Sequence, residues 1–482
     1  MSQAKGVLPT RAEERDLLYK NPRACGYFIG VTLADGATLE QLSAWLKAVD
    51  RAIETLVARE PAEGGKGEGV RVARVAVGVG GRVFAILSAG NSAPELPVGM
   101  RSEAQPPGGW LPPNITLLNA DVLFYVMSVF ETRVNEFMAG ITDSPVVASV
   151  SLEHGYQRSD GTEPFGYKDG LRNVEPSRRS RVVYIHTDRD QPDEPAWTDG
   201  GTYMVLIKID QKPAVFKALP DDAARDSVIG RTKAGTRLDM VGQEVDPHHE
   251  PAEVGAAPAN AHVRKAGPRG KHDDTEIFRR GLPFMEVRDG QLAVGLQFCS
   301  FQANPAQFDA VFNDWLMNPL FPQTTDGSVP GIDALLDPSR SLTDIKHGGV
   351  FFVPPYNEDG LLAALTPPVT QGKPTHARLA VNKVVLDPNG NQARVERSGF
   401  AFRVIREDGT AIEGSKFTTA SSGRGVCPAE LEVGGTYKLI ETGAPPGVTV
   451  APLADMQFVA DKPNIHLKVE NHLPQPPSGY GG

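Results

Sequence analysis

The sequence predicts an α+β fold that is built in two halves and followed by a separate all-β sandwich. Three observations predict it. Mixed strand and helix patterns run over about residues 20–155, and a second set runs over about 200–355. After residue 365 the pattern changes to short strands between turn signals, with no convincing helix. A chain of 482 residues is long enough for about two to four domains, so this division is reasonable.

The first half alternates strand and helix patterns. Apolar residues at three- and four-residue steps indicate helices, and β-rich runs next to glycine turns indicate strands. The predicted strands cover residues 26–33, 70–79, 82–88 and 146–152, and the predicted helices cover 39–58 and 121–138. A strand, a helix and then a hairpin are typical of half of a ferredoxin-like sandwich.

The second half repeats this mixture. An apolar strand is predicted over residues 203–209, another over 292–301, and a helix over 305–317. Between them, residues 242–274 are polar and rich in Pro, Gly, Ala and His. A loop of that length inside a compact domain is uncommon unless it carries function.

A linker is expected at Leu365-Thr366-Pro367-Pro368, where the composition changes. We therefore expect one domain over residues 1–365, a β sandwich over 366–473, and a flexible tail over 474–482.

Composition limits the partners. The formal net charge of −10 disfavours nucleic acid, and no apolar stretch is long enough for a membrane span. The start of the chain shows no signal-peptide pattern, and the three cysteines form no CxxC pair. These features predict a cytoplasmic protein that acts on small molecules. Association with a second copy of the chain stays open.

Two short segments carry residues suited to acid–base or iron chemistry. Asp169 lies between Gly166 and Gly170, in a loop where a buried carboxyl could move protons. His262 lies in the long polar segment, and a neutral imidazole is a common iron ligand. Taken alone, an Asp-Gly pair is more often a turn, and a loop histidine is more often structural.

Other residues compete for these roles. His248, His249 and His272 lie near His262 in sequence. The pair Arg279-Arg280 interrupts an apolar run, where a buried guanidinium could have a function, although paired arginines more often form a solvated face.

Together these segments form an ordered series of motifs that resembles the dye-decolourising (DyP-type) peroxidase family. The matching motifs, in chain order, are Gly166-x-x-Asp169-Gly170, Gly200-Gly201-Thr202-Tyr203-Met204-Val205, Ile229-Gly230-Arg231-Thr232-Lys233, His262-Val263-Arg264-Lys265-Ala266-x-Pro268-Arg269, Arg279-Arg280-Gly281 and Phe298-Cys299-x-Phe301-Gln302. The resemblance covers roughly residues 20–355, and six matches in order are far more specific than one. It implies that the two ferredoxin-like halves, of the dimeric α+β barrel type, enclose one haem b (iron protoporphyrin IX).

The resemblance also implies the role of each site residue. His262 is the proximal iron ligand, Asp169 the distal acid/base and Arg279 the distal cation. Arg280 stays open as the alternative, since the spacing from His262 is slightly shorter than the family's. The further cofactor-binding residues implied are Gly166, Gly170, Arg264, Phe298, Phe301 and Asn304.

Asn304 marks a departure from the family, in which this position often carries a carboxylate that accepts a hydrogen bond from the proximal histidine. An amide can accept the bond but carries no charge. We therefore expect a less basic histidine and a higher iron reduction potential, unless another acid takes the role.

The implied function is a peroxidase that uses hydrogen peroxide to oxidise aromatic, phenolic or dye-like donors, through a ferryl intermediate formed with Asp169 and Arg279. One alternative is a haem-binding or haem-iron-handling protein with little turnover, and another is a scaffold or adhesion protein that works through its β domain. The presence of both Asp169 and Arg279 favours the enzyme, because simple binding needs neither.

The run over residues 434–447 resembles the prealbumin-like (SpaA/Cna-B-type) domains of pilins and surface adhesins. Those domains often contain a Lys–Asn isopeptide bond promoted by a buried Glu. The matching residues are Lys383, Asn471 and Glu441. The equally weighted alternative makes Lys383 a solvated strand residue and Asn471 a turn residue.

Overall fold

The computed structural model describes most of the chain between residues 25 and 474. The described residues are 25–59, 74–89, 94–101, 107–112, 115–128, 131–156, 158, 160–187, 190–191, 193–238, 257–267, 275–322, 324, 327–366, 376–388, 393, 395, 397–420, 423–446, 448–451, 453–461 and 464–474. The expected tail beyond residue 474, most of the expected linker and much of the polar segment 242–274 lie outside them.

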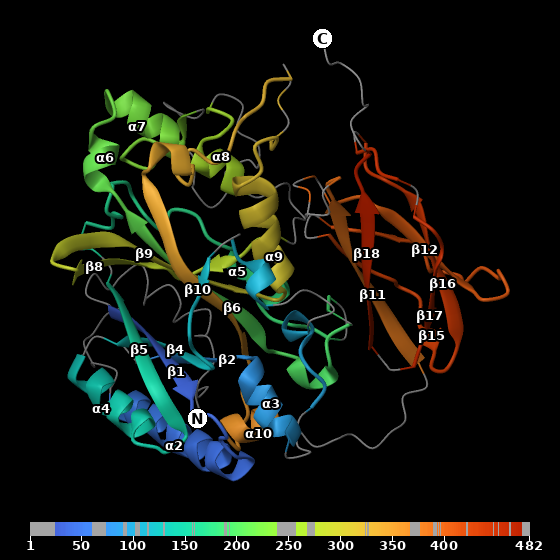
Figure 1. Ribbon diagram of the computed structural model, residues 1–482, viewed down its shortest axis with the longest axis horizontal. Helices are drawn as coiled ribbons and strands as arrows, with labels where there is room; N and C mark the ends of the chain where they lie inside the picture. Colours follow the sequence, from blue (N-terminus) through green and yellow to red (C-terminus); the bar gives the residue numbers. More distant parts are fainter. Residues whose placement is uncertain are drawn as a thin grey trace.

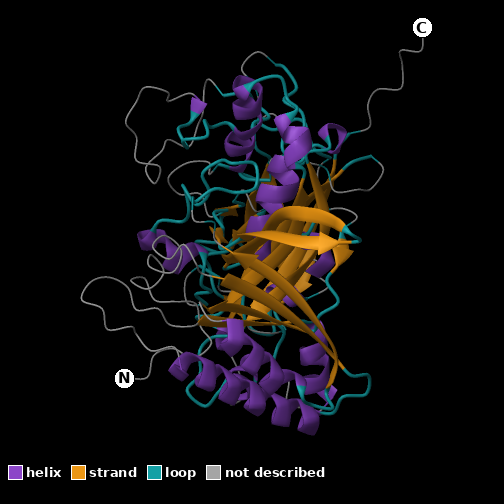
Figure 2. Cartoon of the chain, turned by 90° about the vertical axis from the view of Figure 1, so that its left-hand side faces the viewer, coloured by secondary structure: helices purple, strands orange, loops and turns teal. Residues whose placement is uncertain are grey.

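The first half contains a four-stranded antiparallel sheet with the strand order β5-β1-β4-β2. Helices α2 and α4 cover one face of it, and their apolar side chains share a core with the strands. Figure 2 shows these helices as a layer against the strands. The elements are β1 (Cys25–Leu33), α2 (Leu39–Arg59), β2 (Arg74–Val79), α3 (Gly81–Ala89), η1 (Val98–Met100), η2 (Pro107–Trp110), β3 (Thr116–Leu117), β4 (Val122–Ser128), α4 (Glu131–Thr142) and β5 (Val147–Tyr156).

The second half has the strand order β10-β6-β9, with β7 and β8 pairing successively along the far edge of β9. A helical segment follows β9 and continues as a π-helical stretch, η6. The elements are α5 (Pro176–Val182), η3 (Ala196–Thr198), β6 (Thr202–Gln211), α6 (Pro213–Lys217), α7 (Asp222–Ile229), α8 (His262–Ala266), β7 (Phe278–Arg279), β8 (Leu282–Arg288), β9 (Gln291–Gln302), α9 (Pro305–Asp309), η6 (Ala310–Leu316), η7 (Pro338–Arg340), β10 (Thr343–Val353) and α10 (Leu361–Leu365).

The two halves join into one nearly closed sheet. Val79 of β2 pairs with Phe352 of β10, so the two sheets are continuous. At the other end β5 lies against β8 (Figure 1). Gly155 allows this approach, because a Cβ atom there would lie 2.6 Å from the Leu282 side chain. The space between the halves is filled by apolar side chains from both, including Phe28, Tyr125, Met204, Phe301 and Phe351.

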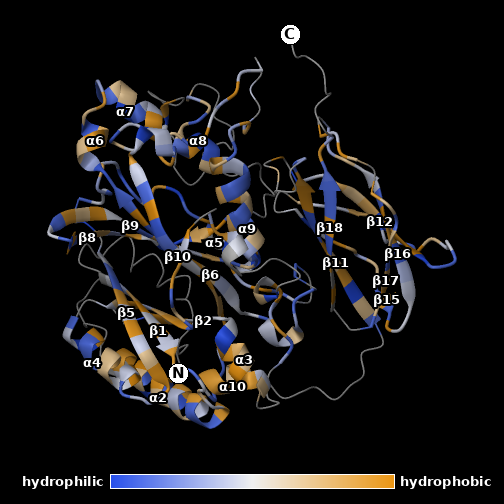
Figure 3. Ribbon diagram, viewed as in Figure 1, coloured by the Kyte–Doolittle hydropathy of each residue, from blue (hydrophilic) through white to orange (hydrophobic). Residues whose placement is uncertain are grey.

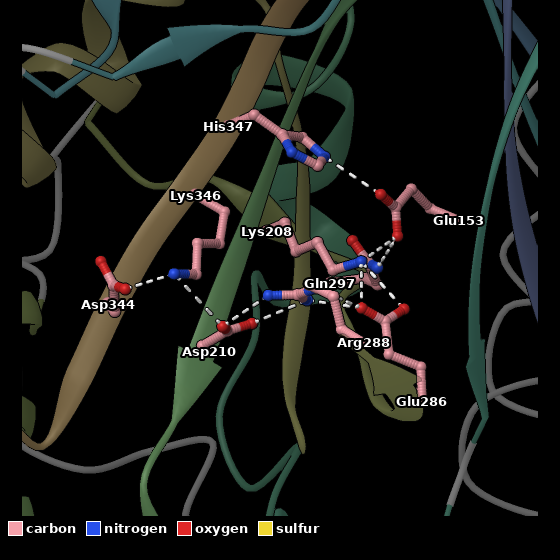
Figure 4. Close-up of polar contacts among 9 residues, drawn as sticks. All are labelled: Glu153, Lys208, Asp210, Glu286, Arg288, Gln297, Asp344, Lys346 and His347. Atoms are coloured by element: carbon pink, nitrogen blue, oxygen red, sulfur yellow. Dashed lines mark hydrogen bonds and ion pairs between the residues drawn. The ribbon is translucent and has the colours of Figure 1, made fainter. Parts of the chain in front are cut away.

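Ion pairs cross the seam where β5 meets the second half (Figure 4). Glu153 of β5 accepts hydrogen bonds from Lys208 of β6 at 2.5 Å and from Gln297 of β9 at 2.7 Å, and it lies 3.2 Å from His347 of β10. Lys208 also contacts Glu286 of β8 at 3.0 Å. This network therefore ties one strand of the first half to four strands of the second.

The network predicts a dependence of stability on pH. Burial alone would raise the pKa of Glu153, but hydrogen bonds and charges from His347 and Lys208 lower it to about 2. Since the folded pKa lies below the usual 4.5, the stabilisation is present above pH 4.5 and is lost as the pH falls toward 2.

We expect Glu153→Gln to lower the free energy of unfolding by about 1–3 kcal/mol at pH 7, with the difference vanishing near pH 2. Urea unfolding over this range, with the exposed Glu40→Gln as control, measures it. A difference independent of pH would contradict the assignment.

The C-terminal β region, residues 376–474, forms two four-stranded sheets that share one apolar core. One sheet contains β14, β11, β15 and β18, and the other contains β13, β12, β16 and β17. Figure 3 shows hydrophobic residues spread along these strands and along the central sheet. The strands are β11 (His376–Leu386), β12 (Ala401–Arg406), β13 (Phe417–Thr418), β14 (Arg424–Val426), β15 (Leu431–Glu432), β16 (Thr436–Gly443), β17 (Met456–Val459) and β18 (Asn464–His472).

Two predictions from periodicity are wrong. Residues 82–88, predicted as a strand, belong to helix α3, and residues 121–138, predicted as one helix, contain strand β4 before α4 begins at Glu131. In α3 the exposed positions Gly81, Ala85, Ser88 and Ala89 carry small residues, so few polar positions mark the helical period. The cause in β4 is different. All seven residues of β4 are buried, because helices cover one face and the second half covers the other. A uniformly apolar run shows neither period clearly.

Within the part of the chain that the structure describes, no helix is long and apolar enough to cross a membrane.

Candidate functional site

A cavity of about 310 Å³ opens in the second half, between its sheet and the α9–η6 helix. Its walls are mainly apolar, with a few charged groups among them. The apolar side chains include Ile207, Ile209, Leu296, Phe298, Phe308, Val311, Phe312, Trp315 and Leu316. The charged or titratable residues are Glu163, Lys168, Asp169, Arg172, Arg231, Arg237, His262, Glu276 and Arg279. Such a mixture is typical of a site for a large, mostly apolar ligand with polar ends.

The loop that carries Asp169 is held by its own backbone. The amide of Asp169 donates to the carbonyl of Gly161 at 3.0 Å, and the amide of Gly170 donates to the Asp169 carboxylate at 2.7 Å. Gly166 and Gly170 have φ values of 87° and 71°, which favour glycine. Gly166 does not line the cavity, and a Cβ there would meet open space, so this glycine serves the turn rather than close ligand approach.

Glu163 fixes the same loop from inside. Its carboxylate accepts the amides of Phe165 and Tyr167, each at 3.0 Å, and the side-chain amide of Gln211 on β6 at 2.9 Å. The loop is therefore anchored to the central sheet.

The Asp169 carboxyl borders the cavity, and the residue is exposed on that side of the loop. Burial by the surrounding protein raises its pKa above the usual 3.8, against the opposing effects of the Gly170 amide and the charge of Arg279. A carboxyl with a raised pKa next to a permanent cation is suited to accept a proton and return it.

Arg279, rather than Arg280, faces the cavity. Its guanidinium donates to the carbonyl of Arg172, and its backbone bonds twice to the Asn173 side chain, at 3.1 and 2.8 Å. Arg280 is 2% exposed and its guanidinium lies 4.7 Å from the centre of the Phe278 ring. Successive residues of a strand point to opposite faces, so only one of the pair can reach the cavity.

His262 begins helix α8 and contributes its ring to the cavity wall. Its Nδ1 lies 3.0 Å from the carboxylate of Asp333, which is fully buried. The other oxygen of Asp333 accepts the amides of Leu335 and Leu336, each at 3.0 Å. A carboxylate that accepts from Nδ1–H leaves the lone pair on Nε2, which is the tautomer that a metal-binding histidine needs.

Asp333 corrects the prediction for Asn304. The Asn304 side chain accepts the amide of Ala306 at 2.9 Å and caps helix α9, and it does not line the cavity. Among the hydrogen bonds of the described residues, Asp333 and not Asn304 contacts the His262 ring.

Two further expected cofactor contacts do not line the cavity. Phe301 lies in the core between the halves, 6.2 Å from the Tyr125 ring, whereas Phe298 lines the cavity. Positions three apart in a strand point to opposite faces. Arg264 is the second of these residues. Its guanidinium donates to the backbone carbonyl of Ala257.

Sequence reasoning missed four cavity residues or supports. Asp333 and Glu163 lie outside the quoted motifs, and Arg231 lies within one but received no role. Arg231 and Arg237 line the cavity with exposures of 6% and 1%. The sequence shows two arginines six residues apart, but their burial is visible only in the structure.

The C-terminal β region holds a second polar cluster. Lys383 is fully buried and donates to Glu441 at 2.6 Å and to the side-chain oxygen of Asn471. The Asn471 side-chain amide donates to Glu441 at 3.1 Å. The Lys383 Nζ lies 4.5 Å from the centre of the Phe400 ring, and burial lowers the pKa of Lys383 against the opposing effect of Glu441. The three residues predicted from sequence therefore meet in one apolar setting.

The fold and cavity together define an α+β protein with one nearly closed antiparallel sheet and a site suited to a large planar ligand. Residues 162–358 match the family model described as "Dyp-type peroxidase, C-terminal". This part of the chain is therefore similar to the C-terminal part of Dyp-type peroxidases.

Individual proteins show the same similarity. The chain is 28% identical over 286 residues to the multifunctional dye peroxidase DyP2 of an Amycolatopsis species, covering 40% of this chain and 60% of that protein. It is 30% identical over 159 residues to a deferrochelatase of Yersinia pseudotuberculosis, covering 31% of this chain and 36% of that protein. The chain thus spans less than two thirds of these relatives.

Solved structures share the fold. The DyP-type peroxidase of Cellulomonas bogoriensis matches with a TM-score of 0.54 at 21% identity, covering 76% of this chain and 99% of that one. Ferric DtpA of Streptomyces lividans matches with a TM-score of 0.55 at 20% identity, covering 75% and 98%.

Proposed function

We propose that this chain is a haem b peroxidase that uses hydrogen peroxide to oxidise small aromatic, phenolic or dye-like donors. One observation carries the proposal: a histidine bonded to a buried carboxylate shares a largely apolar cavity with an acid and a guanidinium. A variant of Rhodococcus jostii DypB, a related structure with a TM-score of 0.50, is described in complex with heme. Each half of the sheet has the strand order of a βαββαβ unit, which supports the ferredoxin-like interpretation.

The cavity residues fit haem. Apolar walls suit the porphyrin ring, and Nε2 of His262 suits iron. Arg231 and Arg237, two buried cations at the wall, would hold its carboxylates. When bound, haem supplies the redox chemistry, while the protein supplies position and electrostatics.

The protein's own residues then act on the peroxide. The Asp169 carboxylate accepts a proton from one peroxide oxygen and returns it to the other, so that water can leave. The guanidinium of Arg279 stays charged and stabilises the negative charge that develops on the leaving oxygen. Asp333 keeps the proton on Nδ1 of His262 throughout. A haem-iron-handling protein needs neither Asp169 nor Arg279 in its cavity, so their presence favours the peroxidase.

Haem titration tests this proposal. We expect the full chain, titrated with haem, to develop a Soret band that shifts on addition of hydrogen peroxide. His262→Ala should lose the wild-type band, because no other histidine lines the cavity among the described residues. Asn304→Asp is the matched control, since aspartate also caps helices and the side chain lies outside the cavity. An unchanged band in His262→Ala would refute the ligand assignment.

For the C-terminal β region we propose a prealbumin-like sandwich with a Lys383–Asn471 isopeptide bond. A neutral Lys383 amine would attack the side-chain carbonyl carbon of Asn471, and a protonated Glu441 would polarise that carbonyl. The new amide bond replaces the carbon–nitrogen bond of the asparagine, and ammonia leaves with the proton that Lys383 releases. The mutual contacts of all three residues support this reaction.

A further inference from the structure

The C-terminal β region docks on the preceding part of the chain through buried arginines. Arg397 is 1% exposed and binds Asp314 at 2.6 Å and Asp309 at 3.0 Å. Arg424 pairs with Asp193, which is fully buried, and donates to the carbonyl of Asp190 at 3.1 Å. Buried ion pairs of this kind fix one orientation of two parts, because separating them exposes unmatched charges.

The partners of Arg397 lie on the helix that forms the cavity wall. Asp309 ends α9 and Asp314 lies within η6, while Phe308, Phe312 and Trp315 of the same helix line the cavity. Figure 1 shows α9 on the side that faces the C-terminal strands. One face of this helix therefore meets the ligand space and the other meets Arg397.

The π-helical geometry makes this arrangement possible. In an α-helix, residues five apart lie about 140° apart around the axis, so Asp309 and Asp314 would point in different directions. In a π-helix the repeating hydrogen bond spans five residues, as in the bond from the Met317 amide to the Phe312 carbonyl at 3.0 Å. Residues five apart then lie much closer together around the axis than in an α-helix, and a single Nη2 of Arg397 contacts both carboxylates.

The same helix also contacts Asp333, the carboxylate that is bonded to His262. The amide of Asp333 donates to the carbonyl of Leu316 at 2.9 Å, and Asp333 holds Nδ1 of His262. A shift of η6 would consequently move both the aromatic wall and the carboxylate that orients the histidine.

We propose that Arg397 is a positioning residue of the cavity, and that the C-terminal β region completes the ligand site by holding the π-helical wall from outside. Without the bridging guanidinium, two buried carboxylates face each other at close range. Their repulsion favours opening of the π-helical stretch, which loosens the wall and weakens ligand binding.

Hydrogen exchange of the haem-free full chain tests the proposal. We expect Arg397→Gln to speed amide exchange at residues 310–317 by about tenfold or more. Arg378→Gln is the matched control: this arginine also crosses the junction, donating to the carbonyl of Thr187 at 2.9 Å, but it does not touch the helix. Equal exchange at residues 310–317 in the two variants would overturn the proposal.

A neutral triple variant covers the case in which Arg397→Gln fails to fold. Asp309→Asn and Asp314→Asn, combined with Arg397→Gln, remove the repulsion, so folding and slow exchange should return. If the triple variant fails as Arg397→Gln does, the electrostatic role is wrong.

A second arm, haem affinity, rests on the proposed function. Arg397→Gln should weaken haem binding about tenfold, measured by quenching of tryptophan fluorescence, to which Trp315 in the cavity wall contributes. Failure of the wild type to bind haem would refute the proposed function alone, because the exchange experiment needs no haem.

Discussion

Asp169→Asn is expected to slow the reaction of the haem-loaded protein with hydrogen peroxide by about two to four orders of magnitude. Asparagine keeps the size and the hydrogen bond from the Gly170 amide, but it cannot accept the peroxide proton. Stopped-flow absorbance in the Soret region measures the rate, and the exposed Asp143→Asn serves as the surface control. A wild-type rate in Asp169→Asn would exclude this carboxyl as the base.

Arg279→Leu should lower the same rate by about two to three orders of magnitude, because charge developing on the leaving oxygen loses its stabilising cation. It should also change the pH dependence. In the proposed mechanism the Asp169 carboxylate accepts the proton, so the rate is expected to rise with pH up to the pKa of Asp169. Burial raises this pKa and Arg279 lowers it, so loss of the guanidinium raises the pKa further. The rising limb should therefore move to higher pH in Arg279→Leu and move much less in Arg279→Lys, which keeps the charge. If the rising part of the rate–pH profile stays at its wild-type position in Arg279→Leu, the charge of Arg279 does not affect the pKa of Asp169.

The sequence motifs located residues of one cavity better than the periodicity located the elements around it. Asp169, His262 and Arg279 come from three distant segments, and all three line one cavity. Periodicity located α2, and apolar or β-rich runs located β1, β6 and β9. It failed at β4, where burial on both faces removes the polar positions that reveal a period, and at α3, whose exposed positions include the apolar Ala85 and Ala89.

The support of the site could not be predicted in the same way. Asp333 is 71 residues from His262, in an irregular segment with no recognisable pattern, and only the fold brings them together. Asn304 was expected in its place because it occupied the family position, yet that residue begins a helix here. The pairing of Arg397 with Asp309 and Asp314 depends on a π-helical stretch, and a helical pattern predicted from apolar spacing does not distinguish it from an α-helix.

The C-terminal cluster was predicted from a resemblance, and the structure adds the environment that decides its chemistry. Lys383 lies on β11, Asn471 on β18 and Glu441 on β16, so the cluster connects the two sheets. Because β11 and β18 are parallel neighbours, a covalent bond between them would join the first and last strands of the region.

Loss of this isopeptide bond is expected to change both the mass and the melting temperature of the protein. Intact mass of the wild type should be lower than the calculated mass by one ammonia, and Glu441→Gln should restore the full mass while keeping the shape of the side chain. A cross-link between residues 88 apart restricts the unfolded chain by about 4–5 kcal/mol on a loop-closure argument. For a region of this size we therefore expect the melting temperature of Glu441→Gln to fall by roughly 15–30 °C. Lys468→Met, an exposed lysine on β18 paired with Glu470, is the matched control and should keep both the mass loss and the melting temperature. The calculated mass in the folded wild type would rule the bond out, since the cluster would then be held by hydrogen bonds and charge alone.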